Sequence, residues 1–415
     1  MPQRKKQTRQ VKTLMRKNYL AGIIAIMILI LAAFPAMGEI SARNTEENGK
    51  ITETVWVDDS GNPAVGPEGY ARVRYTYKRE DTIEKYFDAE GQPYEVSGGY
   101  YGKRVMRDGR GNITEIEYLD EKGDRTLNRK GYALVGITYY GFGEVRTITY
   151  YGLNKKAVMV PSLGYASVYS EYSNKTMTSR TFRDTKGNPV DCADGYAVVK
   201  QKVDKRFRVL SIRYDHANGK PATGPDGWFR CVKSRDDKGR ITSIKYYDVN
   251  EQLTDRGAGY AWEEYTYEGD NIVKVTRRDL NDAVVADSAG VATVVREMKD
   301  DRVVKESFLD SEGKRTNNKL GIGAVLYSYD SQGGLEKVTY QDTEGNPVRC
   351  SAGYAGYKDK KDEDGATISR ILLGTDGEAA EVSAGYSEIR YFYNEYKQLS
   401  STRYYDLNGQ QVQVQ

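Results

Sequence analysis

The sequence predicts an all-β protein: an elongated array of about eleven tandem β-hairpin repeats of about 32 residues, preceded by one N-terminal hydrophobic helix. Three observations predict this fold. A Gly-Tyr-Ala motif recurs at steps of 30 to 33 residues, and an Asp-x-x-Gly motif recurs with the same period. The segments between the motifs alternate apolar and polar residues, as strands with one buried face do. Such regular repetition overrides the usual division of a 415-residue chain into two or three globular domains.

The N-terminus is predicted to be an export segment. Residues 1–19 form a basic leader with seven Lys or Arg and no acidic residue, and residues 20–38 are uncharged and mostly apolar. A helix of 18 residues spans about 27 Å, which approaches the thickness of a hydrocarbon core. The small residues after Pro35 resemble a signal-peptide cleavage site, whereas the long basic leader favours an uncleaved signal anchor. In both cases the basic flank stays in the cytoplasm, so the rest is expected on the extracellular face of a bacterial membrane or secreted.

Residues 39–50 are polar and are interpreted as a linker, and residues 51–415 as the repeat domain. The first motif opens the first strand of each hairpin, as in residues 69–77 (GYARVRYTY). Its glycines and tyrosines are expected to be structural: Gly69, Tyr70, Gly131, Tyr132, Gly195, Tyr196, Gly259, Gly353, Tyr354, Gly385 and Tyr386.

The second motif predicts turns. An Asp at the first position of a turn accepts backbone N–H groups, and a Gly three residues later supplies a left-handed conformation. Representative pairs are Asp88 with Gly91, Asp184 with Gly187, and Asp342 with Gly345. A degenerate form of the same turn joins the two strands of a hairpin, and x-Pro-Val often follows the motif. Each repeat is therefore predicted to be a hairpin plus a proline-containing connector.

These motifs are similar to the bacterial tyrosine–aspartate (RHS-type) repeats, and more loosely to WG-type repeats, over roughly residues 51–415. The period here is longer than that of the usual RHS repeat, and we expect no toxin-like domain after the last turn. The resemblance implies extracellular β-sheet repeats with structural or binding roles.

Charge and composition argue against several functions. Once the seven basic residues of the leader are removed, 55 Lys or Arg face 59 Asp or Glu, so no basic footprint for nucleic acid is present. His216 is the single histidine and occupies a turn position, and Cys192, Cys231 and Cys350 lack metal-ligand spacing. A disulfide between Cys192 and Cys231 is left open. We therefore expect no catalytic residue, no metal and no cofactor.

The aromatic residues are the candidates for ligand binding. Exposed rings at a fixed pitch would suit a polymer, and one group stands out: Trp228, Trp262, Tyr260, Tyr265 and Tyr267. The favoured hypothesis is a surface protein whose array binds cell-wall or capsular polysaccharide or another surface component. The alternative is a structural stalk or protein-interaction scaffold, in which tyrosines fill a thin β core with their hydroxyl groups at the water.

Overall fold

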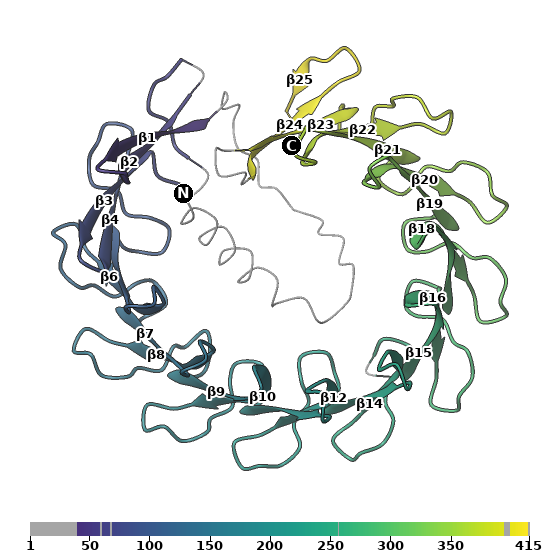
Figure 1. Cartoon of the computed structure of the whole chain (residues 1–415), viewed down its shortest axis with the longest axis horizontal. Helices are drawn as coiled ribbons and strands as arrows, with labels where there is room; N and C mark the ends of the chain where they lie inside the picture. Colours follow the sequence, from purple (N-terminus) through teal and green to yellow (C-terminus); the bar gives the residue numbers. More distant parts are fainter. Residues whose placement is uncertain (1–39, 59, 67–68, 256, 394–398, 414–415) are drawn as a thin grey trace. The chain divides into compact units, whose positions relative to one another are not determined.

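The computed structural model describes residues 40–58, 60–66, 69–255, 257–393 and 399–413. These residues form one antiparallel sheet in which each strand pairs with the next strand along the chain, so the colour in Figure 1 changes steadily from strand to strand. The described part contains strands and turns and no helix, which confirms the all-β prediction. The strands are β1 (Ser41–Glu47), β2 (Lys50–Val57), β3 (Arg72–Lys78), β4 (Asp81–Phe87), β5 (Gly102–Arg107), β6 (Ile113–Leu119), β7 (Leu134–Tyr139), β8 (Val145–Tyr151), β9 (Ser167–Ser173), β10 (Thr176–Arg183), β11 (Val198–Val203), β12 (Val209–Asp215), β13 (Arg230–Arg235), β14 (Ile241–Tyr247), β15 (Trp262–Glu268), β16 (Asn271–Arg278), β17 (Thr293–Lys299), β18 (Arg302–Leu309), β19 (Ala324–Tyr329), β20 (Leu335–Gln341), β21 (Gly356–Lys361), β22 (Thr367–Leu373), β23 (Glu388–Tyr393), β24 (Leu399–Tyr405) and β25 (Gln411–Val412).

The segment predicted to be a linker is instead a paired strand. Within residues 39–50, β1 forms seven residue pairs with β2 around a tight turn at Asn48 and Gly49, both of which have positive φ. The strand is almost entirely exposed and polar, so it lacks the alternation from which the other strands were predicted. The predicted helix at residues 20–38 lies outside the described residues. No helix in the described ranges is long and apolar enough to cross a membrane.

Pairing within a hairpin is extensive, but pairing between hairpins is narrow. The two strands of a hairpin share six or seven residue pairs, as in β13 with β14 and in β15 with β16. The second strand of one hairpin and the first strand of the next share three pairs, as in β14 with β15, and four between β4 and β5. We call this narrow contact a joint. Backbone hydrogen bonds alone therefore hold a joint less firmly than a hairpin.

Most connectors between hairpins begin with the predicted Asp turn, and Gly152, His216 and Gly374 stand at the Asp position in three of them. In the connector after β10, Asp184 Oδ1 accepts the backbone N–H groups of Lys186 and Asn188, and Gly187 has a φ of 88°. Pro189 then lies opposite Arg183 as an isolated bridge. The backbone hydrogen bonds on either side of it run from Asp184 N–H to Asn188 O and from Val190 N–H to Phe182 O. The missing N–H of proline is not needed at such a position, so the x-Pro-Val sequence fits the connector.

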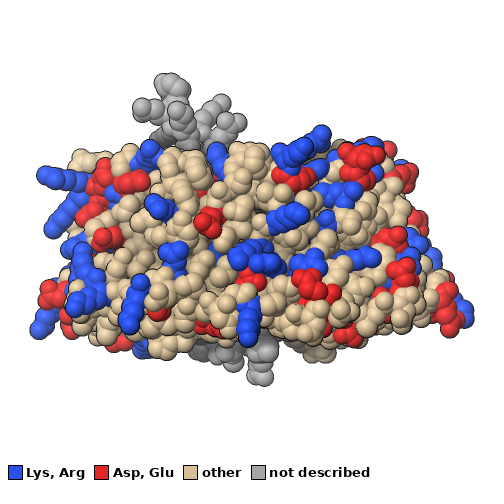
Figure 2. All heavy atoms as spheres, turned by 90° about the horizontal axis from the view of Figure 1, so that it is seen from below, with Lys and Arg blue, Asp and Glu red and all other residues tan. Residues whose placement is uncertain are grey.

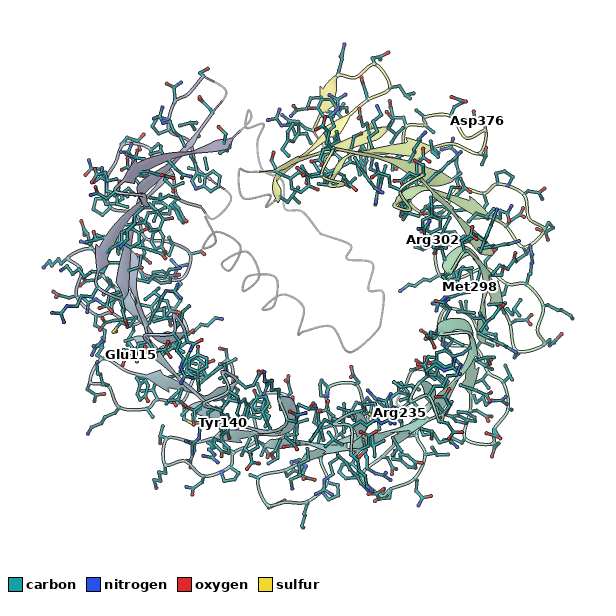
Figure 3. The ribbon with its side chains drawn as sticks, viewed as in Figure 1. Glu115, Tyr140, Arg235, Met298, Arg302 and Asp376 are labelled. Carbon is teal, nitrogen blue, oxygen red and sulfur yellow. The ribbon has the colours of Figure 1, made fainter. Side chains whose placement is uncertain are left out.

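At many joints, a tyrosine side chain forms a hydrogen bond between the two hairpins at the end of the joint away from the connector. Its hydroxyl donates to a backbone carbonyl of the preceding hairpin, always 26 residues earlier in the chain. We call this contact a tyrosine clamp. The clamps are Tyr77 to Ile51, Tyr139 to Ile113, Tyr267 to Ile241, Tyr329 to Val303 and Tyr393 to Thr367, at 2.7–2.8 Å. Arg235 (Figure 3) replaces the tyrosine at one joint and donates to Val209 O at 3.1 Å.

Removing a clamp hydroxyl should loosen one joint. We expect Tyr267→Phe to lower the free energy of unfolding by about 1 kcal/mol, the usual net contribution of one hydrogen bond. Urea unfolding measures this change. Tyr172→Phe is the matched control, because Tyr172 occupies the same strand position but its hydroxyl makes no hydrogen bond to another described residue. Equal losses in both variants would contradict the clamp.

The Asp turns should make the stability depend on pH. Hydrogen bonds from the backbone N–H and the side chain of Arg208 lower the pKa of Asp204, in the turn between β11 and β12, to about 2. The pKa of an Asp in the unfolded chain is near 3.9. The stabilisation of the folded state by the Asp204 carboxylate is therefore complete above about pH 4 and is lost as the pH falls towards 2.

Asp204→Asn keeps an acceptor oxygen and removes the titrating charge. We expect wild type to melt at a higher temperature than Asp204→Asn above pH 5, and the two melting temperatures to converge near pH 2. A constant difference from pH 6 to pH 2 would show that the carboxylate charge does not stabilise the turn.

Candidate functional site

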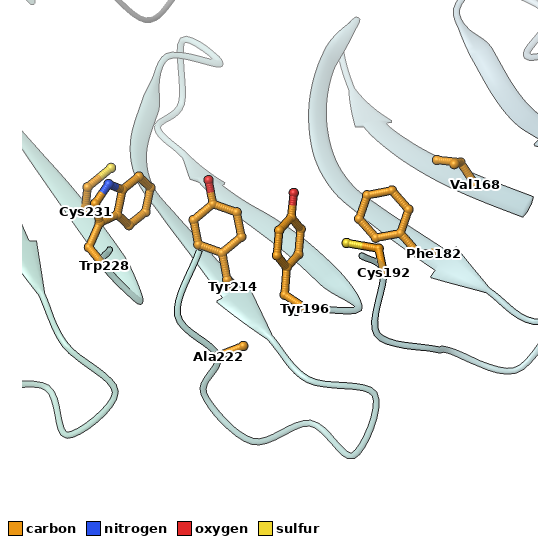
Figure 4. Close-up of a cluster of buried hydrophobic side chains, with 8 residues drawn as sticks. All are labelled: Val168, Phe182, Cys192, Tyr196, Tyr214, Ala222, Trp228 and Cys231. Atoms are coloured by element: carbon orange, nitrogen blue, oxygen red, sulfur yellow. The ribbon is translucent and has the colours of Figure 1, made fainter. Parts of the chain in front are cut away.

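Twelve aromatic rings follow one another along the core of the sheet. Neighbouring ring centroids are 4.7–6.1 Å apart, within the range of favourable aromatic pairs. Part of this aromatic ladder is visible in Figure 4, where four rings stand side by side. The ladder consists of Tyr70, Tyr86, Tyr100, Tyr118, Tyr132, Tyr150, Tyr165, Phe182, Tyr196, Tyr214, Trp228 and Tyr246.

The ladder consists mainly of two residues per repeat. One is the tyrosine of the Gly-Tyr-Ala motif, such as Tyr196, and the other lies near the end of the second strand, such as Tyr214. Burial raises the pKa of Tyr196 to about 12, so its ring stays neutral at physiological pH. The ladder thus crosses the narrow joints and connects one hairpin to the next through side chains.

An arginine occupies a ladder position in β16. Arg277 stands where Tyr246 stands one repeat earlier, and its guanidinium lies 5.4 Å from the ring centroid of Tyr260. It donates to Val291 O at 3.0 Å and forms an ion pair with Asp287 at 3.3 Å. Beyond it the core is more aliphatic, and two separate ring pairs, Tyr340 with Tyr354 and Tyr386 with Tyr404, lie in the described part.

The five residues expected to bind a ligand do not form one exposed row. Trp228, Tyr260 and Trp262 are only 6%, 8% and 8% exposed. Trp228 belongs to the ladder, and Trp262 lies on the opposite face of the sheet between Lys245 and Arg278, at 4.5 and 5.3 Å. The remaining two make internal hydrogen bonds: Tyr265 donates to Glu263 Oε2, and Tyr267 forms a clamp. Ligand binding by these five residues stays a prediction.

Truncating the Trp228 side chain should destabilise the protein strongly. We expect Trp228→Ala to lower the free energy of unfolding by about 3–5 kcal/mol, because the truncation leaves a cavity between Tyr214 and Tyr246. Denaturant unfolding followed by circular dichroism tests this. Phe142→Ala, which truncates an exposed ring, is the control and should change stability by less than about 0.5 kcal/mol. A small loss for Trp228→Ala would contradict a packing role for the ladder.

Outside the core, one hairpin turn carries exposed aromatic rings. The turn between β7 and β8 reads Tyr140-Gly141-Phe142-Gly143, and Tyr140 stands where the hairpin turns of the same length have Asp, as at Asp108, Asp204 and Asp236. The Tyr140 and Phe142 rings are stacked, with centroids 5.1 Å apart and planes 5° apart. Tyr172 of β9 stands at 78° and 75° to these two rings. We call Tyr140, Phe142 and Tyr172, with Arg146 beside them, the aromatic corner.

The backbone of this turn is unchanged although Asp is missing. Tyr140 N–H donates to Glu144 O, and Gly143 N–H donates to Tyr140 O, both at 2.9 Å, as in the Asp turns. The residue at the Asp position is therefore free to serve another purpose. Phe142 is 48% exposed, more than any other aromatic side chain in the described ranges.

Two contacts fix the corner in place. The Tyr140 hydroxyl donates to Ser170 O at 3.1 Å, and Arg110 of the preceding hairpin donates to Gly141 O at 2.8 Å. A hydrogen bond between the Tyr140 and Tyr169 hydroxyls raises the pKa of Tyr140 to about 12, so Tyr140 remains protonated and keeps its donor role. The rings are thus held by groups from the hairpins on both sides.

The corner also offers polar groups that make no hydrogen bond to any described residue. Tyr172 occupies the clamp position of β9, but its hydroxyl makes no hydrogen bond within the described part of the chain. The Arg146 guanidinium lies 5.6 Å from the Tyr140 ring and 6.0 Å from the Tyr169 ring. It has no ion pair or hydrogen bond with any residue that the structure describes. Sequence reasoning missed this site, although the replacement of Asp by an aromatic residue in the turn was a visible signal.

The remaining candidate residues are held in internal contacts. Cys192, Cys231 and Cys350 are free and buried, so the disulfide left open between the first two is not formed (Figure 4). His216 Nδ1 lies 2.7 Å from Asp191 Oδ2, on the surface of a connector turn. The described residues contain no group of three or more His, Cys, Asp or Glu side chains placed to hold a metal ion.

No protein-family model and no curated protein matches this chain. Among solved structures, a TcdB2–TccC3–TEV crystal structure is 13% identical, with a TM-score of 0.28, and the match covers 90% of this chain and 23% of that chain. A porin-like protein from Bacteroides uniformis is 12% identical, with a TM-score of 0.20, over 64% of this chain and 91% of that chain. The chain thus spans about a quarter of the first of these structures. TM-scores of this size carry no conclusion about ligand or activity.

Proposed function

We propose that this chain is an exported scaffold of the bacterial cell surface, which presents its outer groups to a protein partner. The observation that carries the proposal is the burial of Trp228, Tyr260 and Trp262. An array that binds a polymer along its length needs such rings in an exposed row. Here the recurring rings fill the core and join the hairpins, so the repeat has the properties of a structural element.

The charged surface also supports a scaffold. Basic and acidic side chains are interspersed on the face that Figure 2 shows. Several pairs tie neighbouring strands together: the nearly buried Glu117 lies 3.0 Å from Arg104, and Asp215 lies 2.9 Å from Lys200. Buried carboxylates of this kind are tolerated because they are paired. Complementary charge patterns at an interface favour one partner over others, so an outer surface of mixed charge can contribute to partner specificity.

Export is the second part of the proposal. Residues 20–38 would insert as a signal peptide or an anchor, and the basic leader at residues 1–19 would stay in the cytoplasm. The resemblance to tyrosine–aspartate repeats agrees with an extracellular array. The alternative function, an array that binds cell-envelope carbohydrate through repeated aromatic residues, remains as a second hypothesis. No catalytic role is proposed.

The scaffold proposal can be tested by crosslinking in intact bacteria that express the full chain. A photo-crosslinking amino acid would replace, one at a time, the exposed Leu127, Leu153 and Leu280, with the buried Trp228 as a control position. We expect the same protein partner to be crosslinked from at least two exposed positions and not from position 228. External protease should digest the repeats in unlysed cells.

A folded, exported chain that crosslinks to no protein from any exposed position would contradict the scaffold. The polysaccharide array makes a different prediction. Saturable binding to purified cell-wall polymers, weakening stepwise as whole repeats are deleted, would favour the array instead.

A further inference from the structure

We propose that the aromatic corner binds a pyranose unit that carries a carboxylate, a hexuronic acid within an anionic polysaccharide. This single site goes beyond the scaffold function and does not depend on it. The corner is formed by Tyr140, Phe142 and Tyr172, with Arg146 at its side.

The rings offer a flat apolar surface. One face of a pyranose ring carries C–H groups, and aromatic side chains commonly form the apolar part of small-ligand sites. Phe142 is 48% exposed although it stacks on Tyr140, so ring surface remains open to water. No neighbouring atom lies within 4 Å of a Cβ built on Gly141 or Gly143, so there is open space beside the two glycines that flank Phe142.

The size of the corner favours a sugar over a protein. A stable protein interface covers about 800 Å² on each partner, which is far more than three partly covered rings expose. The equivalent hairpin turns elsewhere begin with charged Asp residues, as at Asp108, Asp204 and Asp236. The apolar surface therefore ends at this turn and suits one sugar unit.

The polar groups indicate which sugar. Arg146 has no carboxylate partner in the described structure, and a guanidinium binds a carboxylate through two parallel hydrogen bonds. The Tyr172 hydroxyl is likewise available for a sugar hydroxyl. Glu171 is exposed, and its negative charge acts on the Tyr140 hydroxyl. Because Glu171 repels another carboxylate, we expect the ligand carboxylate to bind on the side of Arg146.

The site is rigid before a ligand arrives. Arg110 and Ser170, from the hairpins on either side, hold Gly141 and Tyr140 by hydrogen bonds of 2.8 and 3.1 Å. Little side-chain freedom is then lost on binding, which helps a small contact area give measurable affinity.

The test measures binding of polygalacturonate oligomers to the full chain in detergent micelles by titration calorimetry. The fully methyl-esterified polymer, in which the carboxylates are blocked, and neutral dextran serve as comparison probes. We expect saturable binding of polygalacturonate and at least tenfold weaker binding of both comparison probes. Phe142→Ala should weaken polygalacturonate binding at least tenfold. Arg146→Gln should remove the preference over the methyl-esterified polymer.

Two controls separate the site from general stability. Leu153→Ala truncates a side chain that is 53% exposed in the following connector and should leave binding unchanged. Tyr172→Phe removes one hydroxyl and should weaken binding severalfold without changing the melting temperature. Absence of binding to wild type, or full binding by Phe142→Ala, would overturn the proposal. Equal binding of all three polymers would overturn the assignment of an acidic sugar.

Discussion

The narrow joint between hairpins is the constraint on which the rest of this structure depends. Three residue pairs, or four in one case, connect one hairpin to the next, whereas six or seven connect the strands inside a hairpin. A lone hairpin is only marginally stable in water, so each joint must be strengthened by side chains. The aromatic ladder, the tyrosine clamps and the Asp turns all act at or beside the joints. An aromatic pair adds about 0.5–1.5 kcal/mol beyond its buried area, which is comparable to one clamp hydrogen bond.

Departures from this arrangement are more informative than the regular repeats. At the β16–β17 joint, Arg277 replaces a ladder ring and Met298 occupies the clamp position (Figure 3), so both reinforcing contacts are altered together. At the β8–β9 joint, Tyr172 makes no clamp hydrogen bond to a described residue and packs against Tyr140 and Phe142. The first departure changes the strength of a joint, and the second creates an exposed group of rings. Residues that a regular array does not need are the ones available for function.

The sequence predicted the hairpins well because their signals are local. The Asp-x-x-Gly turn depends on hydrogen bonds within five residues, as at Asp184, and strand alternation depends on a single buried face. It did not predict β1, because that strand is polar and is recognised only through its pairing with β2. It could not show whether Trp228 was exposed, since Tyr214 and Tyr246, which lie 14 and 18 residues away along the chain, cover its ring only once the strands are paired. The aromatic corner combines residues from two hairpins, so only the missing Asp at Tyr140 was visible in the sequence.

Hydrogen exchange of individual backbone amides tests the central claim most directly. The amide of Tyr246 donates to Ala261 O across the β14–β15 joint, which the Tyr267 clamp closes. The amide of Arg277 donates to Ala292 O across the β16–β17 joint, where Met298 stands at the clamp position. If side chains hold the joints, the Arg277 amide exchanges markedly faster than the Tyr246 amide in the native protein. Equal protection of the two amides, or slower exchange at Arg277, would show that the backbone pairs alone hold the array together.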